Sequence, residues 1–165
     1  MYEIESDIIT KVIAIGEMQS LVQISVIDNQ QMVVQFLNDS RPIEKWEREK
    51  IVTYIHEWFD LDNDLTPFYE MANSDPLLQI PAQKFYGLRV IGIPPDLFEA
   101  LCWGGVLGQQ INLAFAHTLK RQFVESFGDS IEWKSKKYWV FPPYERIAQL
   151  EPTDLAAIKM TVKKK

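Results

Sequence analysis

The first 38 residues constrain the fold more than any other part of the chain. They contain three runs of β-branched and aromatic residues, a composition typical of β-strands, and the runs cover residues 10–15, 21–27 and 32–37. The breaks between them, Gly16-Glu17 and residues 28–30, are short enough for hairpin turns. This pattern predicts an antiparallel meander at the start of the chain.

Helical patterns replace the strands after residue 38. Ser40-Arg41-Pro42 predicts a helix start with Ser40 as its cap. A long amphipathic helix that ends at Gly128 is predicted because large apolar residues recur at every fourth position, namely Ile111, Phe115, Leu119, Phe123 and Phe127. The remaining expectations are short helices at 65–72, 96–103, 143–150 and 153–158, an extended connection at 80–95 and an interruption at Gly104-Gly105.

The charge changes sign along the chain. Up to Gln83 there are five Lys and Arg against 15 Asp and Glu, a balance of −10, whereas from Lys84 onward there are 12 against eight, a balance of +4. Such an asymmetry suggests two units with different partners, and a polyanion would contact the basic one. We therefore expect an α+β protein with an N-terminal sheet domain over residues 1–83 and a helical domain over residues 84–165.

The composition excludes several classes of protein. With 47% hydrophobic residues and nine Pro and seven Gly in 165 residues, the chain is neither disordered nor collagen-like. Cys102 is the single cysteine, which excludes an internal disulfide and a multi-cysteine zinc site, and with only His56 and His117 besides we expect no metal and no cofactor. We read no signal peptide in residues 1–11 and no membrane span, so we expect a cytoplasmic protein.

Three ordered motifs in the second half resemble one family. They are Leu88-Arg89, the run Val106-Leu107-Gly108-Gln109-Gln110-Ile111-Asn112, and Phe141-Pro142 followed by Ile147-Ala148. This order and spacing resemble DNA-3-methyladenine glycosylase II, a family of the helix-hairpin-helix DNA glycosylase superfamily. The resemblance implies base-excision repair of alkylated double-stranded DNA. It also implies a small N-terminal domain similar to the TATA-binding fold.

The resemblance assigns DNA-binding roles to two glutamines. A glycosylase must rotate a base out of the duplex, which costs a few kcal/mol of stacking and pairing, and a side chain must fill the gap. The resemblance gives that wedge role to Gln110 and places Gln109 at the mouth of the base pocket. The alternative is that both glutamines only cap or decorate the start of a helix.

Aromatic residues near these glutamines have two interpretations each. Trp103 could line the base pocket, because an alkylated, electron-poor purine stacks well on an indole, or it could simply pack in the core. Trp133, Tyr138 and Trp139 alternate with lysines and could present bases with a stacking surface. The resemblance implies a variable loop between helices here, so a solvated loop with partly packed aromatics is the stronger expectation.

Two parts of the family pattern are not found in this chain. The family grips DNA with a hairpin that needs glycines, and no glycine follows Gly128. The family's catalytic aspartate has no match either, because Asp129 and Asp154 fall at turn or helix-start positions. We therefore expect an N-terminal fragment with no catalytic residue in this chain, an aspartate beyond Lys165, and an incomplete helical domain.

The sequence thus favours one function and leaves a second open. The favoured one is a monofunctional DNA-3-methyladenine glycosylase that hydrolyses the N-glycosidic bond of alkylated purines, with this fragment itself inactive. The alternative is a non-catalytic module that binds damaged DNA. Because an incomplete helical domain exposes apolar surface, we also expect the fragment to self-associate.

Overall fold

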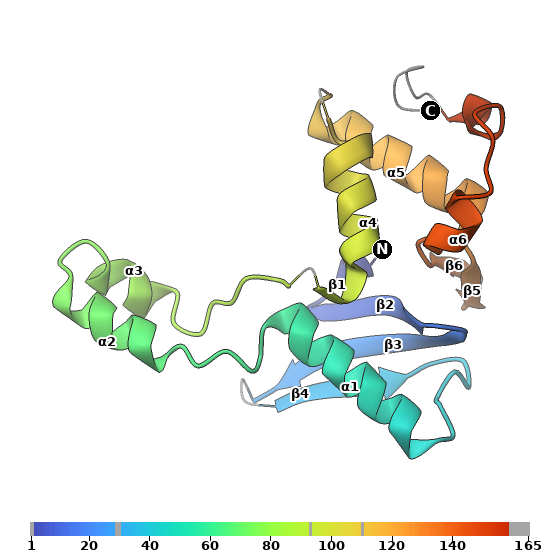
Figure 1. Ribbon diagram of the computed structural model, residues 1–165. Coiled ribbons are helices and arrows are strands. Elements are labelled where there is room, and N and C mark those ends of the chain that lie inside the picture. Colours follow the sequence, from blue (N-terminus) through green and yellow to red (C-terminus); the bar gives the residue numbers. More distant parts are fainter. Residues whose placement is uncertain (1, 29–30, 93, 110, 159–165) are drawn as a thin grey trace. The chain divides into compact units, whose positions relative to one another are not determined.

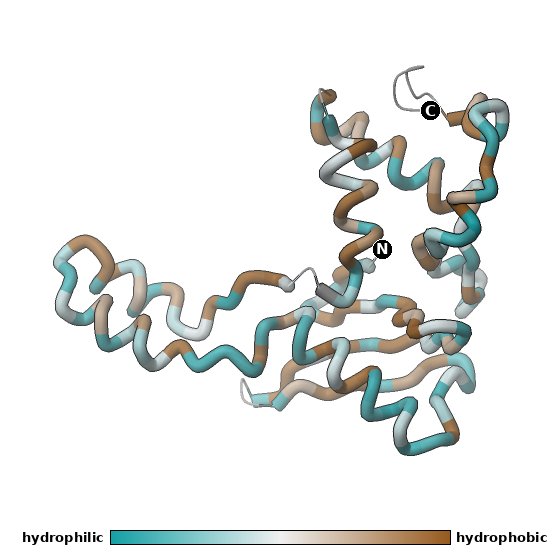
Figure 2. The backbone as a smooth tube through the Cα atoms, in the orientation of Figure 1, coloured by the Kyte–Doolittle hydropathy of each residue, from teal (hydrophilic) through white to brown (hydrophobic). Residues whose placement is uncertain are grey.

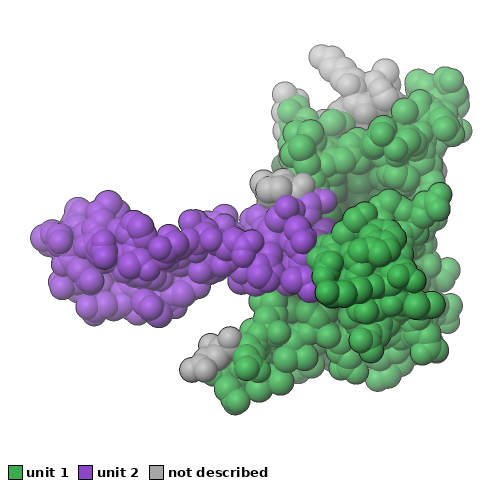
Figure 3. Space-filling view, turned by 60° about the horizontal axis from the view of Figure 1, so that its bottom comes forward, with its two compact units in different colours: residues 1–51, 96–165 green, residues 52–95 purple. Residues whose placement is uncertain are grey.

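The structure is a computed structural model that describes residues 2–28, 31–92, 94–109 and 111–158. The chain forms two compact units, one made of residues 1–51 together with 96–165 and the other of residues 52–95 (Figure 3). The predicted division at residue 83 stays a prediction, because compactness groups residues by packing and not by function.

A four-stranded antiparallel sheet opens the first unit (Figure 1). Its strands, in spatial as well as chain order, are β1 (Tyr2–Glu5), β2 (Ile8–Ile15), β3 (Met18–Ile27) and β4 (Gln31–Phe36). The meander predicted from the sequence is confirmed, and Gly16-Glu17 closes its β2–β3 hairpin, with Ile15 opposite Met18 and Gly16 at φ +61°. Strand β1 was not expected from the sequence.

A second, two-stranded sheet packs on the first. Its strands are β5 (Ser130–Trp133) and β6 (Lys136–Trp139), where a solvated loop was predicted. The stretch pairs as strands instead of forming a loop, whereas the expected partial packing of the aromatics is confirmed for Trp133 and Tyr138. Three buried residues of the main sheet region contact the hairpin and the residue that follows it, and this cluster comprises Val12, Leu21 and Leu37 against Ile131, Trp133, Tyr138 and Val140.

Ser40 has a different role from the predicted helix cap. Its hydroxyl lies 2.6 Å from the Leu37 carbonyl oxygen, to which it donates, and accepts from the Leu21 backbone N–H at 2.8 Å. The Ser20 hydroxyl donates to the Ser40 carbonyl at 2.8 Å. Ser40 therefore ties the chain after β4 to strand β3, and helix α1 (Lys45–Phe59) begins five residues later.

The second unit starts inside α1 and continues through two short helices. These are α2 (Thr66–Ser74), as predicted, and α3 (Gln79–Lys84), which lies where an extended connection was expected. After α3 the chain is extended and returns to α1, where the Gly92 N–H donates to the Trp58 carbonyl at 2.6 Å. A Cβ on Gly92 would lie 2.1 Å from the Glu57 carbonyl oxygen, so this approach needs glycine.

The helical part of the first unit follows. The chain enters it through η1 (Pro94–Asp96), which spans the boundary between the units in sequence. Its elements are α4 (Leu97–Ala100), the π-helix η2 (Leu101–Leu107), α5 (Leu113–Phe127), α6 (Tyr144–Ile147) and the 3₁₀ turn η3 (Asp154–Ala157). The predicted break at Gly104-Gly105 is wrong, because the backbone continues through both glycines as a π-helix. The predicted end of the long helix at Gly128 is confirmed. The core of this part contains Leu107, Leu119, Phe123 and Ile158.

Candidate nucleic-acid interface

The turn between η2 and α5 carries the predicted wedge region. Gly108 ends the π-helix, where its N–H donates to the Trp103 carbonyl at 2.8 Å, and a Cβ there would lie 2.8 Å from the same oxygen. Before the turn Leu107 is fully buried, and after it Ile111 packs on the core of the helical part. Between these anchors Gln109 is exposed. Gln110 lies outside the described residues.

Asn112 fixes the start of α5 immediately after this turn. Its side-chain Oδ1 accepts a hydrogen bond from the Phe115 backbone N–H at 2.9 Å, the geometry of a helix N-cap. The sequence reasoning did not assign this role, although an asparagine before an apolar helix is a recognised start signal. The cap fixes the backbone at the start of α5, three residues after the exposed Gln109.

Trp103 lies at the edge of the helical core. It packs against the buried cluster, and its ring lies 4.9 Å from the His117 ring and 5.1 Å from the Lys120 ammonium nitrogen. Lys120 in turn forms a 2.6 Å ion pair with Glu99, and both side chains are largely buried. The indole of Trp103, which belongs to the π-helix, therefore packs against α5, and one of its neighbours there is the positively charged Lys120.

The electrostatics of this ion pair favour the ionised carboxylate. Burial opposes the ionisation of Glu99, but the positive charges around it, including Lys120 and Lys11, outweigh burial and hold its pKa below the ordinary value of 4.5. Lys11, on β2, pairs with Asp96 at 3.3 Å, and its side chain is 6% exposed. These two ion pairs connect the sheet, the start of α4 and helix α5.

The π-helix presents two glycines to open space. A Cβ added at Gly104 or Gly105 would meet no atom within 4 Å, and neither residue has a positive φ. Neither internal packing nor backbone conformation therefore requires glycine at these positions. Of the three glycines in this stretch, Gly108 is the one that packing requires, because a Cβ there would lie 2.8 Å from the Trp103 carbonyl oxygen.

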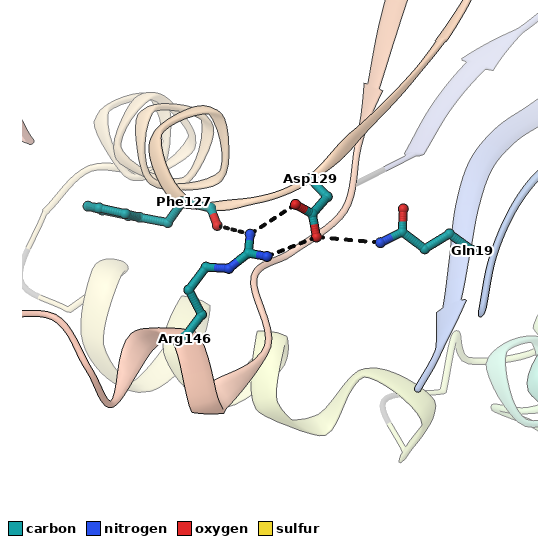
Figure 4. Close-up of polar contacts among 4 residues, drawn as sticks. All are labelled: Gln19, Phe127, Asp129 and Arg146. Carbon is teal, nitrogen blue, oxygen red and sulfur yellow. Dashed lines mark hydrogen bonds and ion pairs between the residues drawn. The ribbon is translucent and has the colours of Figure 1, made fainter. Parts of the chain in front are cut away.

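The two late aspartates have structural partners (Figure 4). Asp129 accepts from Arg146 at 3.0 and 3.2 Å and from the Gln19 amide at 3.5 Å, and Arg146 also donates to the Phe127 carbonyl at 2.7 Å. Asp154 accepts from the Glu151 backbone N–H at 2.8 Å. These contacts agree with the turn and helix-start positions inferred from the sequence.

The lysines of the β5–β6 hairpin stay on its surface. Lys134, Lys136 and Lys137 are exposed, and each ammonium group lies over an aromatic ring of the same hairpin. Lys136 also pairs with Glu3 of β1 at 2.7 Å. Because Trp133 and Tyr138 pack on the main sheet, the hairpin is attached to the sheet through its aromatic residues, and its lysines stay exposed.

Metal and membrane sites were also sought. Within the described residues, no three or more His, Cys, Asp or Glu side chains are grouped so that they could hold a metal ion. Among the helices described, none combines the length and the apolar character that crossing a bilayer requires.

Comparison with known proteins finds similarity to DNA glycosylases. The family described as 8-oxoguanine DNA glycosylase, N-terminal domain, matches residues 1–101. The DNA-3-methyladenine glycosylase of Bacillus subtilis (strain 168) is 82% identical over 164 residues, which are 99% of this chain and 54% of that protein. A second protein of that organism, a putative DNA-3-methyladenine glycosylase, is 36% identical over 59 residues, 36% of this chain and 19% of that protein.

Solved structures share the fold. A 3-methyladenine DNA glycosylase from Archaeoglobus fulgidus superimposes with a TM-score of 0.80 at 24% identity, over 99% of this chain and 54% of that one. A second structure is that of the Clostridium acetobutylicum 8-oxoguanine glycosylase/lyase in complex with double-stranded DNA containing cytosine opposite 8-oxoG. It superimposes with a TM-score of 0.63 at 17% identity, over 99% of this chain and 61% of that one.

These matches confirm the α+β fold and the resemblance inferred from the sequence. The chain spans about half the length of the B. subtilis protein and corresponds to the N-terminal part of the solved glycosylases. The chain belongs to the family of the 8-oxoguanine DNA glycosylase N-terminal domain and is homologous to DNA-3-methyladenine glycosylases of base-excision repair.

Proposed function

We propose that this chain is part of a monofunctional DNA glycosylase that hydrolyses the N-glycosidic bond of alkylated purines of the 3-methyladenine type. The observation that carries the proposal is the 82% identity, over almost the whole chain, with a protein named for that activity. The matching family model takes its name from 8-oxoguanine instead. The B. subtilis protein is 82% identical, against 17% for the 8-oxoguanine glycosylase/lyase of Clostridium acetobutylicum, and this difference favours alkylated purines over oxidised guanine.

Within this function, the turn after η2 is the proposed point of entry into the duplex. Extruding a base costs a few kcal/mol, and a side chain that fills the gap works best when its backbone is held rigidly. Buried Leu107 before the turn, and Ile111 with the Asn112 cap after it, supply such a support. Gln110 is the proposed wedge and Gln109 the proposed residue at the pocket mouth.

Trp103 is the proposed stacking surface for the extruded base. Its ring is oriented by His117 and by the Lys120–Glu99 ion pair. A cationic base that stacks on this indole would be repelled by the positive charge of Lys120. We therefore expect the affinity for a cationic methylated base to rise when Lys120 is replaced by a neutral residue. Core packing alone predicts no such rise.

The chemical step is proposed to lie outside this chain. A carboxylate that stabilises positive charge on the sugar must be able to reach it, whereas Asp129 is engaged by Arg146 and Asp154 by the Glu151 N–H. We accordingly expect the separate 165-residue chain to be inactive, and an aspartate in sequence beyond Lys165 to supply the charge.

Base release tests this assignment directly. Methylated duplex DNA is incubated with the separate chain and, in parallel, with the B. subtilis relative, and free 3-methyladenine is quantified by chromatography. We expect release by the relative and none by the chain. Release by the separate chain would refute the proposed position of the catalytic group. Failure of the B. subtilis relative to release 3-methyladenine would refute the proposed substrate class.

The second candidate function is a non-catalytic module that binds damaged DNA. The exposed Gln109 and the two open glycines on the same stretch favour it, because they could serve recognition without cleavage. Tight binding of the separate chain to an abasic duplex, together with inactivity of a longer protein that contains it, would support this function over the glycosylase.

Self-association of the separate chain is a further part of the proposal. Leu97, Leu101 and Leu113 are exposed apolar residues of the helical part of the first unit, and burying them against a second copy would be favourable. Light scattering should give a mass above 19.2 kDa that falls on Leu101→Asp substitution. A monomer at every working concentration would contradict the proposal.

A further inference from the structure

Three lysines at the turn of the β5–β6 hairpin face solvent. Lys134, Lys136 and Lys137 are exposed, and in Figure 2 the hairpin ends in a hydrophilic turn. Residues 130–139 contain these three lysines against one carboxylate, Glu132, which is a formal balance of +2. The whole chain has a net charge of −6, so this turn is a positive surface on a negatively charged protein.

The hairpin restrains these lysines. The ammonium groups of Lys134 and Lys137 lie 4.3 and 5.7 Å from the centre of a tryptophan ring of the same hairpin. The hairpin is itself anchored, because Trp133 packs on the main sheet and the Asn38 amide donates to the Glu132 carbonyl at 3.0 Å. A side chain that is already restrained loses less conformational freedom when it binds. The two positive charges are therefore well placed to receive a partner.

The aromatic residues of the hairpin do not offer bases a stacking surface. Trp133 and Tyr138 pack on the main sheet, so the alternative that bases stack on them is not supported. The ammonium groups are what the turn presents to solvent. Exposed lysines contact phosphate oxygens, and such contacts position a protein on DNA without reading the base sequence.

We propose that the turn of the β5–β6 hairpin is a second contact with duplex DNA, in which Lys134 and Lys137 each bind a backbone phosphate. Lys136 contributes less, because it already pairs with Glu3 at 2.7 Å. The inference rests on the proposed function, which makes duplex DNA the polyanion that the basic half of the chain meets.

The hairpin lies to one side of the proposed wedge turn. Helix α5 begins after that turn and ends before β5 (Figure 1). Its 15 residues span about 22 Å at about 1.5 Å per residue. This length corresponds to about six or seven base pairs, at about 3.4 Å per pair along the duplex axis. The two lysines should therefore contact only one of the two duplex arms that flank a damaged base.

The salt dependence of binding tests the proposal. Binding of the 165-residue chain to an undamaged fluorescent duplex is measured by anisotropy from low to physiological salt. Lys134→Gln together with Lys137→Gln should reduce the slope of log K against log salt by about 1.8, because each phosphate contact contributes about 0.9. Replacing the same two lysines by arginine should preserve the slope.

Two lysines of helix α1 provide the matched control. Lys45 and Lys50 are also exposed, and the Lys50 ammonium nitrogen lies 4.6 Å from a tryptophan ring. Lys45→Gln together with Lys50→Gln removes the same charge from the chain and should leave the slope unchanged. An equal loss of slope in the two double variants would overturn the proposal, because net charge alone would then explain the binding.

A longer protein tests the predicted side of the contact. The 165-residue chain replaces the corresponding part of the B. subtilis glycosylase, and duplexes carry an abasic-site analogue near one end or near the other. The Lys134→Gln, Lys137→Gln variant should weaken binding to only one of the two duplexes. Equal effects on both duplexes, or no effect on either, would overturn the proposal.

The remaining outcomes separate this contact from the proposed function. A longer protein that releases no base, but whose salt slope still depends on Lys134 and Lys137, would refute the proposed function and not this contact. Binding of polyglutamate that needs the two lysines, with duplex binding that does not, would assign the turn to an acidic polypeptide and overturn the proposal. Absence of duplex binding by both proteins at low salt would overturn it as well.

Discussion

Replacing glycine by alanine should have opposite effects at two positions of the helical part. At Gly128, where α5 ends, a Cβ would lie 2.2 Å from the Val140 carbonyl oxygen and 2.6 Å from that of Val124. Both obstacles are backbone atoms, so relief requires movement of α5 or of the segment after β6. At Gly104 a Cβ would meet nothing within 4 Å.

The expected magnitudes differ in sign as well as size. Overpacking costs about 1–3 kcal/mol, and two backbone obstacles place Gly128→Ala at about 3 kcal/mol. Inside a helix, alanine is better than glycine by roughly 0.5–1 kcal/mol, so Gly104→Ala should be stabilising by that amount. With Tm shifts of about 2–4 °C per kcal/mol for a domain of this size, Gly128→Ala should melt roughly 6–12 °C lower.

Urea unfolding followed by tryptophan fluorescence checks both values on the same chain. Gly105→Ala is the control for Gly104→Ala, because it has the same open surroundings. The reasoning is refuted if Gly128→Ala unfolds at the urea concentration of the unsubstituted chain. It is equally refuted if Gly104→Ala and Gly128→Ala lose the same stability, because the two sites would then not differ in the space available.

Three further predictions concern polar contacts. Ser40→Ala should lower the free energy of unfolding by about 1–2 kcal/mol, because the hydroxyl joins Leu21 and Leu37, and urea unfolding should show less loss for Ser40→Thr. The pKa of Glu99 is lowered in the folded chain, so ionised Glu99 adds to the free energy of unfolding above pH 4.5, and this contribution is lost as the pH falls through the folded-state pKa. The urea midpoint of the unsubstituted chain should therefore drop more between pH 6 and pH 3 than that of the Glu99→Gln variant. Arg146→Ala should cost about 1 kcal/mol or less, since the pair with Asp129 is half exposed, but should speed amide exchange in the β5–β6 hairpin.

The strands and the long helix could be predicted because their patterns are local. Runs of β-branched residues located three of the four strands of the main sheet, and Gly16 signalled the turn of one hairpin. Four-residue spacing located α5, and Gly128 marked its end. In each case the residues that define the element lie within the element itself.

The missed elements lack such local signals. The β5–β6 hairpin turns at Lys134 and Ser135, both with positive φ, a conformation that usually contains Asn or Gly and is therefore hard to recognise here. Strand β1 is exposed along its whole length, so it has no alternation of buried and exposed residues to reveal it. Ser40 binds across to β3, and this long-range contact outweighs its tendency to cap a helix.

The candidate site was predicted in part. The sequence singled out residues 103–112, and in the described part of this stretch Gly108 lies close against the Trp103 carbonyl and Asn112 caps α5. The sequence did not predict the π-helix. The partners of Trp103 could not be foreseen, because they depend on packing between η2 and α5. The family match covers residues 1–101, although the sequence reasoning found no motif in the strands there.

A chimeric enzyme tests the central claim most directly. The corresponding part of the B. subtilis glycosylase is replaced by this 165-residue chain, and the release of 3-methyladenine from methylated duplex DNA is measured under single-turnover conditions. We expect the chimera to release 3-methyladenine at a rate within tenfold of the B. subtilis enzyme. Introducing Gln110→Ala should lower this rate at least tenfold and should leave the urea midpoint of the chimera unchanged. A folded chimera that releases no base, or one that is indifferent to Gln110→Ala, would contradict the account.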